Sequence, residues 1–382
     1  MIDPGRLRAY LKLHLAEGVG AVTFKRLVET FGDVEAAAKA RGQWQRVEGV
    51  GPKTAEALEG VTDAQIDEEL AAAAKAGAEI VVLEDRRYPT ALAAIHDPPP
   101  VLYVRGRMEP TDALAISVVG SRHCTHYGLE QAERFGQLLG RAGFTVVSGG
   151  ARGIDTAAHR GALGAGGRTI TVMGCGLCQT YPRENDKLFE QIVSEDRGAM
   201  ISELPMRTAV LGGNFPTRNR IISGLSLGVL IVEAARRSGS LHTAREAAEQ
   251  GREVFALPGR VDSPLSQGAN ELIRNGAILV QDLDDILEHL GQVGAKMGVE
   301  EAADQEPLPR GLNETESSLL AALREGPASL DELVRSTGID SGKAASAMTM
   351  LVLRGLVIQQ PGSIFAAKGK PRSAKRQTDD RQ

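Results

Sequence analysis

Three segments rich in glycine and serine have the composition of loops that bind phosphate. Each follows a run of apolar residues and precedes a helical stretch. The first turn of a helix leaves backbone N–H groups free and carries a partial positive charge, so such a loop can hold a phosphate. Three of them at one edge of a sheet predict a ligand with several phosphates. The segments are Gly120-Ser121-Arg122, Ser148-Gly149-Gly150-Ala151-Arg152-Gly153 and Ser238-Gly239-Ser240.

The charges around these loops are mostly positive, although the chain as a whole is slightly acidic. It contains 44 basic and 49 acidic residues, which gives a net charge of −5. No acid occurs between Glu203 and Glu233, and Asp155 is the only acid between Glu133 and Glu184. Arginines are present in both stretches. The loops are therefore expected to form a positive edge that binds a polyanion.

The run from Asn214 to Arg220, which reads NFPTRNR, adds an aromatic ring to these cations. Phe215 is suited to stack on a base, which contributes about 1–3 kcal/mol and tolerates any base. Arg218 and Arg220 are expected to hold phosphates, and Asn219 to bond the backbone or a base. Taken alone, Phe215 is better explained as a core residue beside a helix start.

Short apolar runs alternate with helical stretches from about residue 78 to 290, which predicts an α/β fold with a Rossmann-like parallel sheet covered on both faces. Ligands of such sheets lie at the carboxyl ends of the strands. Asp155 and Glu233 are expected to cap or orient loops there. The candidate strands are 79–83, 101–105, 115–119, 145–148, 169–173, 199–202, 228–233, 253–256 and 277–280, and the candidate helices are 128–140, 155–163, 185–194, 217–224, 240–249 and 269–274.

The remaining chain predicts further domains on either side of the sheet. Residues 1–75 are helical, and the repeated segments Glu17–Gly20 and Glu48–Gly51 resemble helix-hairpin-helix units, either for phosphate contact or as ordinary glycine turns. The expected division is a helical (SAM/helix-hairpin-helix-like) domain at 1–75, a Rossmann-like DNA-binding domain at 76–290, a linker at 291–311, a winged helix at 312–366 and a disordered basic tail at 367–382.

The winged helix is not expected to be the main DNA-binding domain. Residues 312–365 contain six acids and four bases, for a net charge of −2. Its recognition helix offers Lys343 and Arg354 but is otherwise built mostly from Ala, Met, Ser and Leu. A helix that reads the major groove usually presents Arg, Lys, Asn or Gln. A protein contact or an accessory role is the expectation.

Several classes of protein are excluded or disfavoured. There is no P-loop motif, and no acid follows Gly120 at the spacing of a dinucleotide site, so no nucleotide cofactor is expected. The segment from Cys175 to Cys178 is interpreted as a tight turn rather than as a redox pair or half a zinc site. A second candidate, His123 with His126, lacks a partner cluster of ligands. No metal is therefore expected. Three cysteines and no apolar run of about 18 residues indicate a cytoplasmic protein without membrane contact.

From about Tyr88 to Val280, the sequence resembles the DNA-processing protein A family (DprA, also called Smf). The resemblance implies a protein that binds single-stranded DNA in natural transformation, forms homodimers, loads the recombinase RecA and helps to displace single-strand-binding protein. It implies no enzymatic activity, and it places Arg122 and Phe215 in the DNA pocket. Where the family often has lysine, this chain has Gly212, for which Arg207 is a candidate substitute. The supporting runs are Asp97–Tyr103, Val119–Arg122, Ser148–His159, Phe215–Gly224, Ser238–Ala244 and Leu257–Gly259.

An enzyme remains as the alternative. The run from Ser238 to Glu246 keeps the register of a motif of nucleotide phosphoribohydrolases, in which the glutamate is catalytic. Gly239, Thr243 and Glu246 match that motif, whereas its proline and two of its glycines are missing. The alternative function is thus hydrolysis of a small nucleotide with Glu246.

Overall fold

The computed structural model divides the chain into two compact units, Met1–Val299 and Glu300–Gln382. Most of the expected linker, from residue 297 onward, and the expected basic tail, from residue 368 onward, lie outside the described residues. Among the residues described, no helix is long and apolar enough to cross a bilayer. The structure describes residues 2–296, 313–325, 328–353, 356–360 and 364–367.

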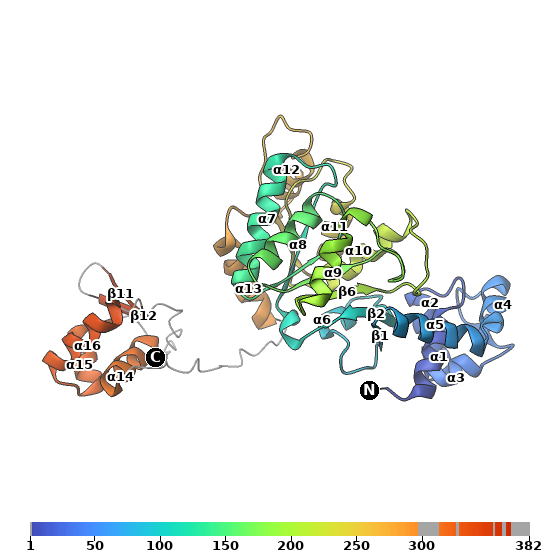
Figure 1. Cartoon of the computed structure of the whole chain (residues 1–382), viewed down its shortest axis with the longest axis horizontal. Coiled ribbons are helices and arrows are strands. Elements are labelled where there is room, and N and C mark those ends of the chain that lie inside the picture. Colours follow the sequence, from blue (N-terminus) through green and yellow to red (C-terminus); the bar gives the residue numbers. More distant parts are fainter. Residues whose placement is uncertain (1, 297–312, 326–327, 354–355, 361–363, 368–382) are drawn as a thin grey trace, which may run out of the picture. The chain divides into compact units, whose positions relative to one another are not determined.

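A mixed nine-stranded sheet with the order β1-β2-β6-β5-β4-β3-β7-β8-β9 forms the centre of the first unit (Figure 1). From β6 to β9 all neighbours are parallel, as expected for a Rossmann-like fold. The strands are β1 (Ala78–Val82), β2 (Val101–Gly106), β3 (Ala115–Val119), β4 (Thr145–Ser148), β5 (Thr169–Val172), β6 (Gly198–Ser202), β7 (Gly228–Ile231), β8 (Glu253–Ala256) and β9 (Ile278–Leu279).

One edge of the sheet differs from the predicted all-parallel arrangement. β1 pairs with β2, and β2 pairs with β6, in antiparallel register. The apolar runs indicated burial on both faces, and this is correct: Val101 and Tyr103 of β2 pack into one core, and Leu102 and Val104 into the other. Burial on both faces does not fix strand direction, so the prediction was wrong for β1 and β2.

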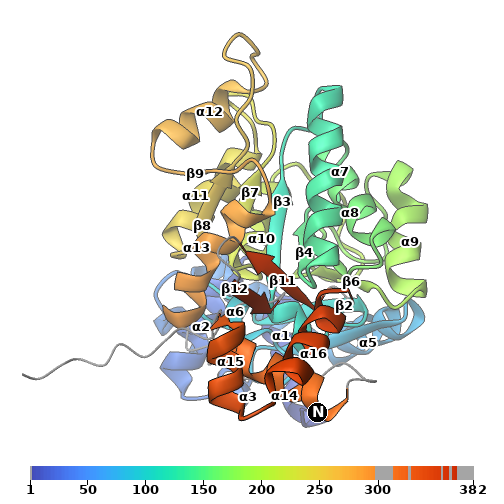
Figure 2. The ribbon, with the colours of Figure 1, turned by 90° about the vertical axis from the view of Figure 1, so that its left-hand side faces the viewer.

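Helices cover both faces of the sheet (Figures 1 and 2). Side chains of β3 point alternately into the cores on the two faces of the sheet. Ile116 and Val118 pack into one core, and Ala115 and Val119 pack into the other. One face carries α7 (His126–Arg141), α8 (Ile154–Gly164), α9 (Asp186–Ser194) and α13 (Leu283–Lys296), and the other α6 (Thr90–Ala93), α10 (Asn214–Gly224), α11 (Ser240–Glu249) and α12 (Gln267–Arg274).

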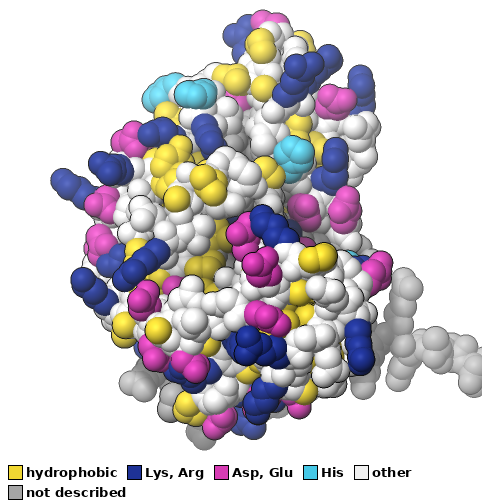
Figure 3. Space-filling view, turned by 90° about the vertical axis from the view of Figure 1, so that its right-hand side faces the viewer, with side chains coloured by type: hydrophobic (Ala, Val, Ile, Leu, Met, Phe, Trp, Pro, Cys, Tyr) yellow, Lys and Arg dark blue, Asp and Glu magenta, His cyan; other side chains and the backbone are white. Residues whose placement is uncertain are grey.

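The N-terminal helices share a core with the β2–β6 side of the sheet. Lys53 Nζ lies 3.1 Å from a carboxylate oxygen of Glu17, and Arg26 pairs with Glu48, so basic groups at the two glycine hairpins are ion-paired. On the face shown in Figure 3, basic and acidic side chains are interspersed rather than separated. The helices are α1 (Pro4–His14), α2 (Ala21–Phe31), α3 (Val34–Lys39), α4 (Pro52–Gly60) and α5 (Asp63–Lys75), with the 3-10 turn η1 (Trp44–Arg46).

The second unit has the three helices expected of a winged helix and a small antiparallel sheet of order β10-β12-β11. The exposed side chains of α16 include Lys343, Ala345, Thr349 and Met350, so its surface is mostly small or apolar. The elements are α14 (Glu314–Glu325), β10 (Ala328–Ser329), α15 (Leu330–Thr337), α16 (Ser341–Leu353), β11 (Val357–Gln360) and β12 (Ile364–Ala367).

The sheet reverses its winding direction at β3. β3 lies between β4, which begins the order toward β6, and β7, which begins the order toward β9. In open α/β sheets a crevice forms at such a point, because the connections on its two sides leave in opposite directions. The carboxyl ends of β3 and β7 are therefore where a ligand site is expected.

Close packing of α7 against α8 generates a stability prediction. A Cβ atom added at Gly161 would lie 2.1 Å from the backbone oxygen of Glu133, so no side chain fits between the helices. We expect Gly161→Ala to lower the free energy of unfolding by about 1–3 kcal/mol, the usual cost of overpacking. Denaturant unfolding measures this effect.

The matched control is Gly164→Ala at the end of the same helix. An added Cβ there meets nothing within 4 Å. Because alanine favours a helix by up to about 1 kcal/mol over glycine, this variant should be neutral or slightly more stable. Equal destabilisation by both variants would contradict the packing argument.

Candidate functional site

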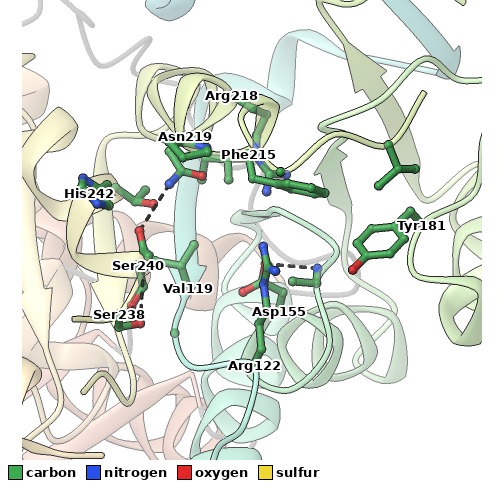
Figure 4. A pocket seen from close by; sticks show the side chains of 18 residues that line it. Val119, Arg122, Asp155, Tyr181, Phe215, Arg218, Asn219, Ser238, Ser240 and His242 are labelled. Atoms are coloured by element: carbon green, nitrogen blue, oxygen red, sulfur yellow. Dashed lines mark hydrogen bonds between the residues drawn. The ribbon is translucent and has the colours of Figure 1, made fainter. Parts of the chain in front are cut away.

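A cavity of about 540 Å³ lies at the reversal point, at the carboxyl ends of β3, β4 and β7 (Figure 4). Residues that follow each of these strands line it, together with the first turns of α10. This is the edge that the sequence predicted. The lining includes Gly120 and Arg122 after β3, Ala151 and Asp155 after β4, Tyr181 after β5, Ser238, Gly239 and Ser240 after β7, and Phe215, Arg218 and Asn219 of α10.

Arg122 and Phe215 are adjacent in this cavity. The guanidinium carbon of Arg122 lies 5.0 Å from the centre of the Phe215 ring. Arg122 is exposed and forms no ion pair within the described part of the chain. Phe215 is half-buried and rests on Gly174, where a Cβ atom would lie 2.9 Å from the ring. The pair thus offers an available cation beside an aromatic surface.

Phe215 belongs to α10 itself, whereas the sequence predicted a helix start at Thr217. The helix begins at Asn214 because Pro216 falls in its first turn, where the missing N–H of proline has no intrahelical partner to lose. Phe215, Arg218 and Asn219 therefore project from one helix toward the cavity.

A buried charge pair forms the floor of the cavity. Arg218 is 4% exposed and donates from Nη1 to the backbone oxygens of Gly149 and Val172. Burial lowers the pKa of Arg218 to about 10, with nearby Asp155 acting in the opposite direction, so the group remains a cation at neutral pH. Burial also raises the pKa of Asp155, whereas the nearby positive charge of Arg218 lowers it in part.

The loop after β7 forms the opposite wall. The hydroxyls of Ser238 and Ser240 lie 2.8 Å apart, and Asn219 Nδ2 donates to the backbone oxygen of Gly239 at 3.4 Å. Gly239, the N-cap of α11, has no capping side chain, and the Ser240 N–H donates to Ser238 Oγ at 3.4 Å. Asn219 therefore holds this loop in place, and the two serines present hydroxyls to the cavity (Figure 4).

Carboxylates of the chain lie near the helix starts that follow the other two predicted phosphate loops. Glu233 accepts from the backbone N–H and the hydroxyl of Thr125, the N-cap of α7, at 2.7 and 2.9 Å. Asp155 accepts from the backbone N–H groups of Gly149 and Ala151, both at 3.2 Å. Asp155 thus takes two amides of the loop at Ser148–Gly153, whereas Glu233 bonds Thr125, which lies beyond Gly120–Arg122; the phosphate contacts of both loops stay predictions. The capping roles expected for Asp155 and Glu233 are confirmed.

Arg220 also has a different role from the phosphate contact predicted for it. Its side chain is 7% exposed and pairs with Asp97 at 2.8 Å and Glu203 at 2.6 Å. All three guanidinium nitrogens donate to these carboxylates. Both acids lie outside the stretch that the sequence showed to be acid-free. Arg220 is thus a structural residue.

The remaining predicted site residues support the cavity rather than line it. Ser148 is fully buried and donates to the backbone oxygen of Val118. Ser121 bonds the backbone of His123 on the outside. Arg152 pairs with Glu184 at 2.6 Å. The residues that the structure does not place among the lining are Ser121, Ser148, Gly149, Gly150, Arg152, Gly153 and Arg220.

Tyr181 is a lining residue that the sequence analysis missed. Its ring centre lies 5.6 Å from that of Phe215, with an angle of 51° between the planes. It is 34 positions away in the chain, in the loop after β5. The sequence offered one indication of this role, a tyrosine after a strand in a chain with few aromatic residues. The sequence analysis considered only the nearby turn at Cys175–Cys178.

The alternative sites receive little support from the geometry. Within the described residues, no three of His, Cys, Asp and Glu lie together as a metal site. Cys175 is buried and burial raises its pKa to about 11, which disfavours the reactive thiolate. From α11, Ser240, His242 and Thr243 line the cavity, and Glu246 is not among the described lining residues.

The fold and the cavity define the class of protein: a Rossmann-like sheet with a ligand site at its reversal point, followed by a winged helix. Residues 79–291 match the family described as DNA recombination-mediator protein A, and residues 303–363 match the DprA winged helix domain. The chain belongs to this family, which is also known as DprA or Smf.

Individual relatives agree with this assignment. Protein Smf of Synechocystis sp. is 37% identical, with 91% of this chain and 95% of the relative covered. The crystal structure of DNA processing protein A from Streptococcus pneumoniae matches with a TM-score of 0.64 and 33% identity, over 75% of this chain and 98% of that one. DNA processing protein A from Helicobacter pylori, a protein described as binding single-stranded DNA, matches with a TM-score of 0.50 and 31% identity, over 57% of this chain and 98% of that one.

The contrast between two arginines generates a stability prediction. Removing one partner of a buried ion pair leaves an uncompensated charge, so Arg220→Ala should lower the free energy of unfolding by about 3–5 kcal/mol. Arg122→Ala removes an exposed side chain and should change it by less than about 0.5 kcal/mol. Denaturant unfolding of both variants checks this, and a neutral Arg220→Ala would refute its structural role.

A buried histidine generates a pH prediction. His159 of α8 is fully buried, and its Nδ1 donates to Thr169 Oγ1 at 2.6 Å, since Thr169 itself donates to Val146. Burial lowers the pKa of His159 to about 3. Below pH about 6.5 the unfolded chain takes up a proton there and the folded chain does not, so stability falls by up to about 1.4 kcal/mol per pH unit as the pH drops toward 3.

His159→Gln removes this titration. The dependence of the unfolding free energy on pH between about 6.5 and 4 should become shallower in the variant, by up to the slope of one proton. His126→Gln is the control, because the His126 side chain is 86% exposed. An unchanged slope in His159→Gln would show that His159 does not titrate as argued.

Proposed function

We propose that this chain is a DNA-processing protein that binds single-stranded DNA in the cavity at β3 and β7. The observation that carries the proposal is the guanidinium of Arg122, which has no ion-pair partner among the described residues, beside the half-exposed ring of Phe215. A cation for the backbone and a ring for a base are the two elements of a site for single strands. The relative from Helicobacter pylori, described as binding single-stranded DNA, supports the same ligand.

The proposed binding set is the predicted one without Arg220. Arg122 and Phe215 contact the DNA directly, and Ser238, Gly239 and Ser240 contact the backbone from the α11 side. Arg218 contributes positive potential from the floor, since its Nη1 is committed to the backbone. The residues that we propose to shape these contacts are Gly120, Ser121, Ser148, Gly149, Gly150, Arg152, Gly153 and Asn219.

We propose binding rather than catalysis. Among the described residues that line the cavity, Asp155 is the carboxylate, and it is buried and already accepts two backbone hydrogen bonds. Both bonds end on Oδ2 and hold the carboxyl group against the backbone of its own loop, which favours a capping role over a catalytic one. Glu246, the candidate of the hydrolase alternative, does not line the cavity.

We extend the proposal to the partners that the family resemblance implies. These are homodimer formation, loading of RecA onto the bound strand during natural transformation in the cytoplasm, and displacement of single-strand-binding protein. In the proposed division of the chain, residues 76–290 bind DNA, and residues 1–75 and 312–366 have accessory roles. The small or apolar surface of α16 supports the accessory role of residues 312–366.

Fluorescence anisotropy with labelled oligo-dT and with its duplex tests the proposal. The parent should bind oligo-dT more tightly than duplex, and less tightly as salt rises. Phe215→Ala should weaken binding about tenfold, the effect of one lost stacking surface. Arg122→Ala should also weaken it and reduce the slope of log K against log salt by about 0.7, the value for one phosphate contact on a single strand.

Arg141→Ala is the matched control for charge. Arg141 is exposed at the last turn of α7, at the opposite end of that helix from the Arg122 loop. The Arg141→Ala variant should bind oligo-dT with the affinity of the parent protein. Parent-like binding by both Arg122→Ala and Phe215→Ala, or no binding of oligo-dT by the parent at low salt, would refute the proposal.

A further inference from the structure

Tyr181 gives the cavity a second aromatic surface. It lies at the end of the cavity away from Ser238 and Ser240, beyond Phe215 (Figure 4). The two rings touch at a tilt of 51°, with centres 5.6 Å apart. A flat base cannot stack on both tilted rings at once, so each ring is a separate surface for one base.

Each ring also has its own cation. The guanidinium carbon of Arg122 lies 5.0 Å from the centre of Phe215, and that of Arg152 lies 6.0 Å from the centre of Tyr181. Arg152 pairs with Glu184, but both side chains are at least half exposed. Such exposed pairs are weak, so a phosphate can compete for Arg152. The pairs Phe215–Arg122 and Tyr181–Arg152 thus repeat a ring and a cation, as a strand repeats a base and a phosphate.

Buried contacts fix the positions of both rings. Asn185, four residues after Tyr181, donates to the backbone oxygen of Gly150 at 3.0 Å and to Thr156 Oγ1 at 2.7 Å. This ties the Tyr181 segment to the loop that also carries Arg152. The rings are therefore held in place before a ligand arrives, which reduces the entropy lost on binding.

The loops that carry the rings are also tied to each other. The backbone N–H of Cys178 donates to Met206, and that of Gly176 donates to Thr208, in the segment that leads to Phe215. A Cβ atom at Gly176 would lie 2.2 Å from the backbone oxygen of Pro205. The tight turn at Cys175–Cys178 therefore connects the loop that carries Tyr181 to the segment that leads to Phe215.

We propose that Tyr181 and Arg152 form a second nucleotide subsite, so that the cavity takes two consecutive nucleotides of a single strand with their bases tilted apart. This inference rests on the proposed function. Consecutive bases of a duplex are parallel, and they cannot follow two rings that are inclined by 51°. The tilt between Phe215 and Tyr181 thus selects single strands over duplex.

Anisotropy with labelled oligo-dT and a matching duplex tests the subsite. Tyr181→Ala should bind oligo-dT about tenfold more weakly, with unchanged affinity for duplex, so the preference for single strands shrinks. Tyr181→Phe should bind like the parent, because stacking needs the ring and not the hydroxyl. Tyr127→Ala is the control: Tyr127 is 43% exposed on α7 and does not line the cavity.

A second readout reports stacking itself. Tyr181→Trp places an indole at the subsite, and oligo-dT should quench its fluorescence as a base stacks on it. The native Trp44 is buried in the N-terminal helices, so the parent supplies the baseline, and Tyr127→Trp is the control. This measurement applies even if the alanine variant folds poorly.

The outcomes separate the two proposals. If the parent and Tyr181→Ala bind oligo-dT equally and the indole at 181 is not quenched, the second subsite is wrong and the proposed function stands. If Tyr181→Phe loses affinity as Tyr181→Ala does, the ring is not acting by stacking and the subsite is also wrong. If the parent does not bind oligo-dT, both proposals fail.

Discussion

The guanidinium of Arg218 lies where two strand ends and one helix meet. It bonds the backbone oxygens of Gly149 and Val172 at the ends of β4 and β5, and it belongs to the helix that carries Phe215. Asp155 balances the charge from the other side and holds the amides of the same loop. A buried cation needs such partners, because without them its desolvation would destabilise the fold. The position of the ring above the floor follows from this pair.

The sheet and the N-terminal helices are continuous in packing. Tyr103 of β2 and Met200 of β6 share a core with Leu11 and Trp44 of the helical segment. Glu69 of α5 accepts from the backbone N–H of Met206, in the segment that leads to Phe215. The helices therefore help to position the cavity from a distance, while residues 300–382 form a separate unit.

Sequence patterns predicted the strands of the sheet well, because a buried strand is a short run of consecutive apolar residues. Runs such as Ala115–Val119 and Glu253–Ala256 are strands with the predicted bounds. They could not predict strand direction at the antiparallel edge, since burial on both faces is common to both directions. Charge counts along the chain predicted a positive edge, but they could not show that Arg220 pairs with Asp97, which is 123 positions away. Tyr181 was missed for the same reason: its neighbour Phe215 is close only in the folded chain.

The carboxylates of Glu233 and Asp155 accept hydrogen bonds from backbone N–H groups that precede α7 and α8, those of Thr125, Gly149 and Ala151. The N–H groups of Thr125, Gly149 and Ala151 are therefore satisfied within the chain, without a ligand. A bound strand would therefore not have to satisfy these N–H groups, and its departure would not leave them without acceptors. In the function proposed above, release of a strand would then depend on the two rings, on Arg122 and Arg152, and on the loop at Ser238–Ser240.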